Sequence, residues 1–170
     1  CAVVAAETAC EIISQVRLGL RRTRTLELRL DYLRSAEELE AFLSWLGRKR
    51  PRGVLIATCR RQEGGGRYRG SRAEEIEVLA RAARAGCDWC DVEIETAKHM
   101  ARGELARALS PARVMVSHHD FRGTPRGLAG IARQLKRAGG QAIKIAAQSR
   151  SVSDSLRICE LARSRRNIVS

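Results

Sequence analysis

Lys144 is the strongest candidate for a reactive side chain, because it stands in the apolar segment Ala-Ile-Lys-Ile-Ala. Such a segment predicts a strand, and burial in that strand disfavours the charged ammonium form of the lysine. A neutral amine is a nucleophile that forms a Schiff base with a ketone. A structural ion pair with Glu93 or Asp91 is the alternative that the pattern leaves open.

A histidine and a glutamate are the next candidates for chemistry. His119 lies in Ser-His-His-Asp-Phe, at the end of a predicted strand, where an imidazole can transfer protons near neutral pH. Glu63 opens a run of three glycines, which permit positive φ and close backbone approach. This loop could hold Glu63 against His119, so that Glu63 fixes the orientation and charge of the imidazole. An ordinary polar loop position for the histidine, and a simple turn for the glycines, are the alternatives.

Charged residues at other predicted strand ends could bind a substrate. Glu27, Arg29 and Arg60 occupy such positions, and arginine binds carboxylates through paired hydrogen bonds. A zinc site is disfavoured because Cys59 has the wrong strand parity beside Arg60, so we predict no metal. The lone Cys-x-x-Cys at 87–90 falls where a helix ends and a strand begins, and we interpret it as two small buried residues.

Strands and helices alternate along the chain. Apolar spacing and capping pairs such as Ser35 with Glu38 predict helices that follow strands through short connections. This alternation indicates a parallel sheet with right-handed crossovers. The predicted strands are 1–6, 25–31, 53–60, 89–95, 113–119, 141–147 and the start of a seventh at 168–169. The predicted helices are 8–20, 35–49, 71–85, 97–109, 124–138 and 151–164.

The faces of the strands distinguish a barrel from an open doubly wound sheet. Strands 25–31 and 89–95 carry charges on one face, which alone would indicate an antiparallel sheet with one wet face. The intervening helices argue against that arrangement, and inward polar residues near strand ends line the active sites of barrels. No Gly-x-Gly-x-x-Gly follows the first strand. A complete barrel needs at least about 200 residues. We therefore predict an α/β fold, a (β/α)8 TIM barrel that is incomplete, with about six βα units in a single domain over residues 1–170.

Composition narrows the classes of partner. The chain has 170 residues, 44% hydrophobic, with 32 Lys and Arg against 19 Asp and Glu. Only four of the basic residues are lysine, and aromatic residues make up 4%. A basic solvated surface is therefore favoured over nucleic-acid binding, which uses stacking aromatics beside a basic groove. No apolar run is long enough for a membrane span and no secretory signal is visible, so we expect a cytoplasmic protein.

Taken together, these segments resemble the type I 3-dehydroquinate dehydratases of the shikimate pathway. Each piece alone is weak, but all occur in the family's order across essentially the whole chain, and the joint match is specific. The matching segments are Glu27-Leu-Arg-Leu-Asp-Tyr-Leu33, Thr58-Cys-Arg60, Glu63-Gly-Gly65, Tyr68-Arg-Gly-Ser71, Asp91-Val-Glu-Ile94, Ser117-His-His-Asp-Phe121, Gly123-Thr-Pro125 and Lys144-Ile-Ala146.

The resemblance implies a dehydration of 3-dehydroquinate to 3-dehydroshikimate that uses neither metal nor cofactor. Lys144 would form an imine with the C3 ketone, and His119 would act as general base and acid at C2 and at the C1 hydroxyl. Glu63 would orient His119 and tune its charge. The resemblance also implies that the substrate's hydroxyls and carboxylate are bound by Glu27, Arg29 and Arg60.

The chain departs from the family pattern in three places. The spacer between Arg60 and Glu63 is one residue shorter, and Ala-Gln-Ser follows Ala146 where a methionine is common. The family's arginine after strand seven and its serine and glutamine after strand eight have no counterpart before Ser170. Because an open barrel exposes unpaired strand edges, we expect the 170-residue chain alone to be poorly soluble or oligomeric, with negligible activity.

Other functions stay open from the sequence. A truncated or catalytically dead dehydratase-like protein could serve as a metabolite-binding module. A nucleic-acid-binding protein would show a steep salt dependence. A class I aldolase would share the barrel and the lysine. The oligomeric state is undetermined, with a homodimer as one option, and so is membership of a multifunctional chain.

Overall fold

The computed structural model describes residues 1–101, 103–163 and 168–169, and these form two compact units. The first unit comprises residues 1–91 and 107–113, and the second comprises the described residues of 92–106 and 114–169. The division falls within β4 (Trp89–Glu93), so Asp91 belongs to the first unit and Glu93 to the second.

The first unit is built on parallel strands that follow one another in the sheet as they do in the chain. They are β1 (Ala2–Val4), β2 (Thr25–Arg29), β3 (Val54–Thr58) and the beginning of β4. Paired residues of β2 and β3 share a face, with Leu26 beside Leu55 and Leu28 beside Ala57. All four are fully buried, which makes this face the core of the unit.

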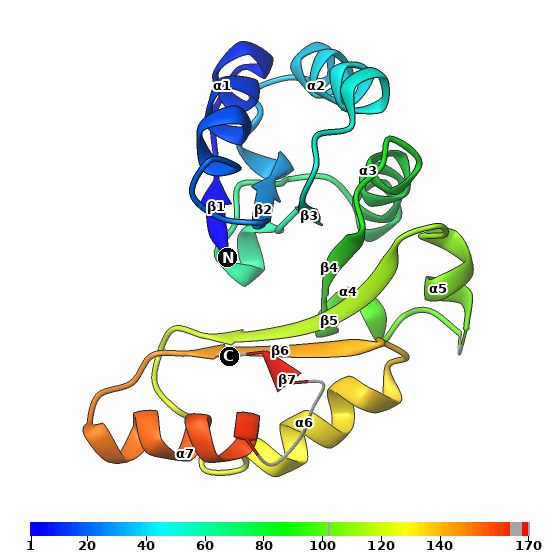
Figure 1. Cartoon of the computed structure of the whole chain (residues 1–170). Coiled ribbons are helices and arrows are strands. Elements are labelled where there is room, and N and C mark those ends of the chain that lie inside the picture. The colour runs from blue at the N-terminus through cyan, green and yellow to red at the C-terminus, as the bar shows by residue number, and fades with distance from the viewer. Residues whose placement is uncertain (102, 164–167, 170) are drawn as a thin grey trace. The chain divides into compact units, whose positions relative to one another are not determined.

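A helix follows each of the first three strands in this unit (Figure 1). These are α1 (Ala9–Gly19), α2 (Ala36–Lys49) and α3 (Arg72–Arg84), with the short turns η1 (Leu30–Tyr32) and η2 (Gln62–Gly64) after β2 and β3. Their starts agree with the capping signals, because Ser35 accepts the Glu38 amide and Ser71 forms a capping box with Glu74.

The second unit repeats the pattern with β5 (Arg113–Asp120), β6 (Ala142–Ala147) and β7 (Ile168–Val169), again parallel and in chain order. Its helices are α4 (Ile94–Ala97), α6 (Leu128–Arg137) and α7 (Val152–Arg163), and the division between the units passes through the short helix α5 (Glu104–Ala108) after Ala106. Figure 1 shows α6 and α7 on one face of β5 and β6. Val116 and Ile143 are paired and fully buried on that apolar face.

Parallel strands in chain order, with a helix between successive strands, are the repeat of a (β/α) barrel. The predicted fold class, an incomplete α/β barrel, is therefore confirmed. Some predicted elements were wrong in part. The strand predicted over 89–95 ends at Glu93, and the helix predicted over 97–109 is interrupted, because Gly103 adopts a φ of 81°.

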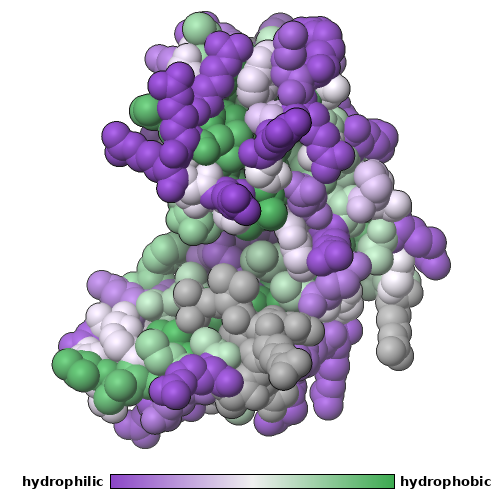
Figure 2. All heavy atoms as spheres, viewed as in Figure 1, coloured by the Kyte–Doolittle hydropathy of each residue, from purple (hydrophilic) through white to green (hydrophobic). Residues whose placement is uncertain are grey.

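Hydrophilic side chains dominate the face drawn in Figure 2, and hydrophobic atoms lie over the start of α7. Val152 and Leu156 are 77% and 57% exposed there. No helix in the described part of the chain is both long and apolar enough to span a membrane.

The six cysteines divide evenly between core and surface. Cys59, Cys87 and Cys90 are buried, whereas the exposed members are Cys1, Cys10 and Cys159. Positions 87 and 90 are small core residues, so the interpretation of the Cys-x-x-Cys segment is confirmed. Burial raises the pKa of all three buried thiols above the ordinary value of 9.0, that of Cys90 to about 12.

We expect the free energy of unfolding to fall steeply above about pH 9. The folded state keeps the proton on each buried thiol, while the unfolded chain releases it, so stability is complete below the unfolded pKa and declines as pH rises. The slope is at most about 1.4 kcal/mol per pH unit for each thiol. Urea unfolding between pH 7.5 and 11 measures it. Cys90→Ala should flatten the slope and Cys10→Ala should not; equal slopes in both variants would refute the explanation.

Candidate active site

A carboxylate at the end of β4 holds the histidine at the end of β5. Glu93 Oε2 lies 2.9 Å from Nδ1 of His119, and Glu93 Oε1 accepts the His119 backbone N–H at 3.1 Å. Ser117 Oγ donates to Glu93 Oε2 at 3.4 Å. The His119 side chain is only 5% exposed. Its ring is therefore fixed in orientation by one carboxylate that binds both its side chain and its backbone.

The contact with Glu93 determines which ring nitrogen of His119 can react. An ionised carboxylate only accepts hydrogen bonds, so in the neutral imidazole the proton belongs on Nδ1. Nε2 then carries the free lone pair and can accept a proton from a substrate. Once protonated, the imidazolium is stabilised by the adjacent carboxylate, as in the catalytic triads of hydrolases. The geometry is that of an oriented general base and acid.

Lys144 stands on β6 beside the strand that carries the histidine. Lys144 pairs with Ser117, and His119 pairs with Ala146 two residues further on. Paired residues of neighbouring strands share a face, and residues two apart on one strand share it too. The side chains of Lys144, Ser117 and His119 therefore project from the same face, opposite the apolar one. An amine and an oriented imidazole thus occupy one polar surface within the second unit.

The first unit places Glu27 and Arg60 in buried polar contacts. Thr58 Oγ1 donates to Glu27 Oε1 at 2.9 Å, and both residues are buried. Arg60 Nη2 lies 3.1 Å from Asp91 Oδ2, with side-chain exposures of 8% and 0%. Charges this deeply buried persist only when they are paired and hydrogen-bonded. These groups are therefore held in fixed positions by their partners.

Arg29 is clamped by the residue that follows it in the η1 turn. Its Nε and Nη2 donate to the two carboxylate oxygens of Asp31 at 2.9 and 2.8 Å. This bidentate contact raises the pKa of Arg29 above its ordinary value. Asp31 is fully buried and also accepts the backbone N–H of Arg67 at 3.0 Å, so it ties the loop after β3 to the end of β2.

The glycine-rich loop after β3 folds tightly against that strand. Gly65 adopts a φ of 78°, and a Cβ on Gly66 would lie 2.0 Å from the carbonyl oxygen of Arg60. Glu63 is 72% exposed and forms an ion pair with Arg61 at 2.9 Å. The Arg61 guanidinium lowers the pKa of Glu63 to about 2, so its carboxylate is ionised across the physiological range.

The structure brings together some of the predicted site residues within each unit. Lys144 and His119 share a polar face in the second unit, whereas the others, namely Glu27, Arg29, Arg60 and Glu63, belong to the first. The predicted contact between Glu63 and His119 joins the two units and stays a prediction. Sequence reasoning missed the contact that Glu93 makes with His119. Its signal was a carboxylate at the end of the strand that precedes the strand of the histidine.

Comparison with known proteins decides the family. The sequence model of the family described as "Type I 3-dehydroquinase" matches residues 1–169.

The chain belongs to the type I 3-dehydroquinase family.

The matches between this chain and curated members of the family cover different shares of those proteins' length. The 3-dehydroquinate dehydratase of Syntrophobacter fumaroxidans is 36% identical over 149 residues, which are 80% of this chain and 58% of that protein. The 3-dehydroquinate dehydratase of Methanopyrus kandleri is 31% identical over 168 residues, which are 95% of this chain and 74% of that protein. The chain thus spans little more than half the length of the first relative.

Solved structures of 3-dehydroquinate dehydratases show the same fold as this chain. The 3-dehydroquinate dehydratase of Geobacillus kaustophilus matches with a TM-score of 0.81 at 24% identity, covering 96% of this chain and 67% of that structure. The enzyme of Aquifex aeolicus matches with a TM-score of 0.67 at 25% identity, covering 96% of this chain and 74% of that structure.

Proposed function

We propose that this chain carries the reacting groups of a 3-dehydroquinate dehydratase, with Lys144 as the nucleophile and His119 as general acid and base. The observation that carries the proposal is the His119–Glu93 pair, which leaves Nε2 as the basic nitrogen on the face shared with Lys144. Membership of the type I family supports the same reaction. The substrate is a cyclic hydroxyketone carboxylate, whose ketone is the natural electrophile for an amine.

The first stage is the formation of an imine. Nζ of Lys144 attacks C3 of the substrate, and the carbonyl oxygen becomes a hydroxyl that leaves as water when it takes a proton from His119. The resulting C=N bond, protonated on nitrogen, withdraws electrons from C2 far more strongly than the ketone does. The C2 proton is thereby acidified without a metal ion.

The second stage is the elimination. Nε2 of His119 removes the C2 proton, the C2–H electrons form the C1–C2 double bond, and the C1 hydroxyl leaves as water with a proton from His119. The same imidazole accepts and returns one proton, so its charge is unchanged over the stage. Hydrolysis of the imine consumes the water lost earlier and releases 3-dehydroshikimate and the free lysine.

The charged residues of the first unit are proposed to bind the substrate. Arg29 and Arg60 suit the carboxylate, and Glu27 suits a hydroxyl. We assign the positioning of His119 to Glu93 on the strength of its contacts. Glu63 stays a predicted site residue, with an ionised carboxylate at the head of the loop that returns to Arg60.

Reductive trapping tests the proposal. Borohydride converts an imine to a stable amine, so incubation with 3-dehydroquinate and borohydride should leave a ligand adduct on the peptide that contains Lys144, located by mass spectrometry. Lys144→Ala should give no adduct. Lys98→Ala, which removes a surface lysine paired with Glu95, should retain it. An adduct on another lysine would contradict the role of Lys144. If the folded chain gives no adduct, the same test on a chain extended through barrel units seven and eight decides: an adduct there supports the dehydration, and none there favours the non-catalytic metabolite-binding alternative.

A further inference from the structure

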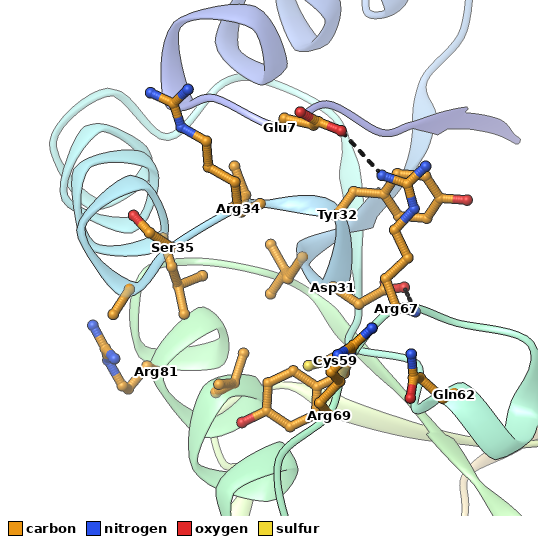
Figure 3. Close-up of a pocket in the computed structure, with 16 residues that line it drawn as sticks. Glu7, Asp31, Tyr32, Arg34, Ser35, Cys59, Gln62, Arg67, Arg69 and Arg81 are labelled. Atoms are coloured by element: carbon orange, nitrogen blue, oxygen red, sulfur yellow. Dashed lines mark hydrogen bonds and ion pairs between the residues drawn. The ribbon is translucent and has the colours of Figure 1, made fainter.

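A cavity of about 770 Å³ opens in the first unit among η1, the start of α2, the loop after β3, and α3 (Figure 3). This volume is within the range of sites for small organic ligands. Its described lining includes none of the residues proposed to act in the dehydration, so it needs an explanation of its own. Two parts of its lining bear on the kind of ligand: an apolar floor and a charged rim.

The floor of the cavity is apolar and comes from four separate elements. Leu30 belongs to η1, Leu39 to α2, Cys59 to the end of β3, and Val78 to α3. Each of them is at most 9% exposed, so the floor is fixed by core packing. A ligand that uses this floor gains stability by removing apolar surface from water, and it must therefore have an apolar body.

The rim of the cavity is rich in arginine, and most of its charges are already balanced. Arg34 is paired with Glu38 at 2.9 Å and Arg67 with Glu7 at 3.2 Å. Arg81 forms an ion pair with Glu40.

Two carboxylates belong to the described lining, Glu7 and Asp31. Asp31 is neutralised by its bidentate contact with Arg29. The remaining rim arginine, Arg69, makes no hydrogen bond or ion pair with any residue in the described part of the chain. Among the charged side chains that line the cavity, the uncompensated charge is therefore one positive charge, located on Arg69.

We propose that this cavity binds a small organic monoanion, a carboxylate carried on an apolar ring. The ring would lie on the floor of Leu30, Leu39, Cys59 and Val78, and the carboxylate would take paired hydrogen bonds from the Arg69 guanidinium. A single uncompensated arginine matches a single negative charge, which favours a carboxylate over a phosphate dianion. The site is distinct from the proposed dehydration site, and its occupant need not be a substrate.

Calorimetric titration with benzoate tests the proposal, because benzoate combines one carboxylate with one apolar ring. Benzyl alcohol keeps the ring without the charge, and acetate and inorganic phosphate keep a charge without the ring. We expect saturable binding of benzoate and at least tenfold weaker binding of the other three. Equal affinity for benzyl alcohol would overturn the role of Arg69, and equal affinity for acetate or phosphate would reduce the cavity to a simple ion site.

Paired variants locate the binding. Arg69→Gln should weaken benzoate binding by about tenfold or more, the loss typical of a charge-assisted hydrogen bond, whereas Arg21→Gln on the exposed surface should not. Ala36→Trp, at an exposed lining position of α2, should block the cavity. Ala41→Trp, also exposed on α2 but outside the lining, should bind normally.

Binding that survives both Arg69→Gln and Ala36→Trp would place benzoate elsewhere and overturn the proposal, as would no binding to the folded protein. Thermal unfolding of each variant verifies that it is folded. None of these substitutions touches Lys144, His119 or Glu93, so the outcome is independent of the reductive trapping result.

Discussion

In a chain extended through barrel units seven and eight, replacement of Lys144 by alanine is expected to lower kcat for dehydration by about 10⁵-fold or more, the scale seen when a covalent nucleophile is removed. Without the amine no imine forms, and the C2 proton keeps the acidity of a proton beside a ketone. Substrate binding by the charged residues of the first unit should persist. The spectroscopic assay of product formation, with calorimetric binding of substrate to the same variant, separates the two effects.

Chemical rescue distinguishes loss of the nucleophile from loss of structure. Lys144→Cys should be equally inactive, and alkylation with bromoethylamine should restore part of the activity by rebuilding a side chain with a terminal amine. The exposed cysteines at positions 1, 10 and 159 are alkylated in the same treatment. Lys144→Ala treated identically is therefore the matched control. Recovery in that control, or no recovery in Lys144→Cys despite complete alkylation, would contradict the assignment.

Replacement of His119 by alanine is expected to lower kcat by about 10³- to 10⁴-fold, within the range of general acid–base catalysis. The loss is large because one imidazole acts in imine formation, in proton removal and in the departure of the C1 hydroxyl. Imine formation should slow and not vanish, so borohydride should still trap an adduct on Lys144 after long incubation. Rapid-quench trapping measures the rate of adduct formation against that of product release.

A double-mutant cycle tests whether Glu93 acts through His119. Glu93→Gln removes the negative charge that stabilises the imidazolium, and it should cost kcat about 10²-fold or more by analogy with triad carboxylates. Addition of Glu93→Gln to His119→Ala should then cause little further loss, because two residues that act as a unit are not additive. Independent, multiplicative losses would show that Glu93 serves the site in some other way.

Local sequence signals predicted most of the elements that position the site. Thr25-Leu-Glu-Leu-Arg alternates strictly, and β2 covers those residues. Ser35 and Ser71 begin helices at the predicted residues because each hydroxyl accepts a backbone N–H of its own first turn. Such signals depend only on neighbours in the chain, so they can be interpreted without knowledge of the fold.

Contacts between distant segments set the boundaries that were predicted wrongly. A helix was expected from Thr124, with Pro125 in its first turn, but α6 begins at Leu128. Arg157 of α7 donates to the carbonyl oxygens of Pro125 and Thr124 at 3.1 and 3.3 Å, and Thr124 Oγ1 donates to Gln148 O. These bonds hold both residues outside the helix, and no local sequence signal predicts them.

The site residues show the same division between local and distant information. The alternation of Asp91, Glu93 and Glu95 predicted three inward charges, yet the strand ends at Glu93 and Glu95 turns to the surface, where it pairs with Lys98. His119 and Lys144 were predicted as site residues from residue type and strand position. Which carboxylate orients His119 depends on which strand ends are adjacent in the sheet. The identification of Glu93 therefore required the structure.

The preference for arginine over lysine leaves the chain unusually well suited to nuclear magnetic resonance. Only four lysines are present, and their surroundings differ: Lys49 and Lys136 are exposed, Lys98 is in an ion pair with Glu95, and Lys144 is half-buried on β6. Protein grown on lysine enriched with ¹³C at the ε-carbon would give one ε-carbon signal for each of them. A single substitution would assign each signal, so the conversion of one amine to an imine could be followed in the intact protein, without reductant, as the displacement of one resonance among four.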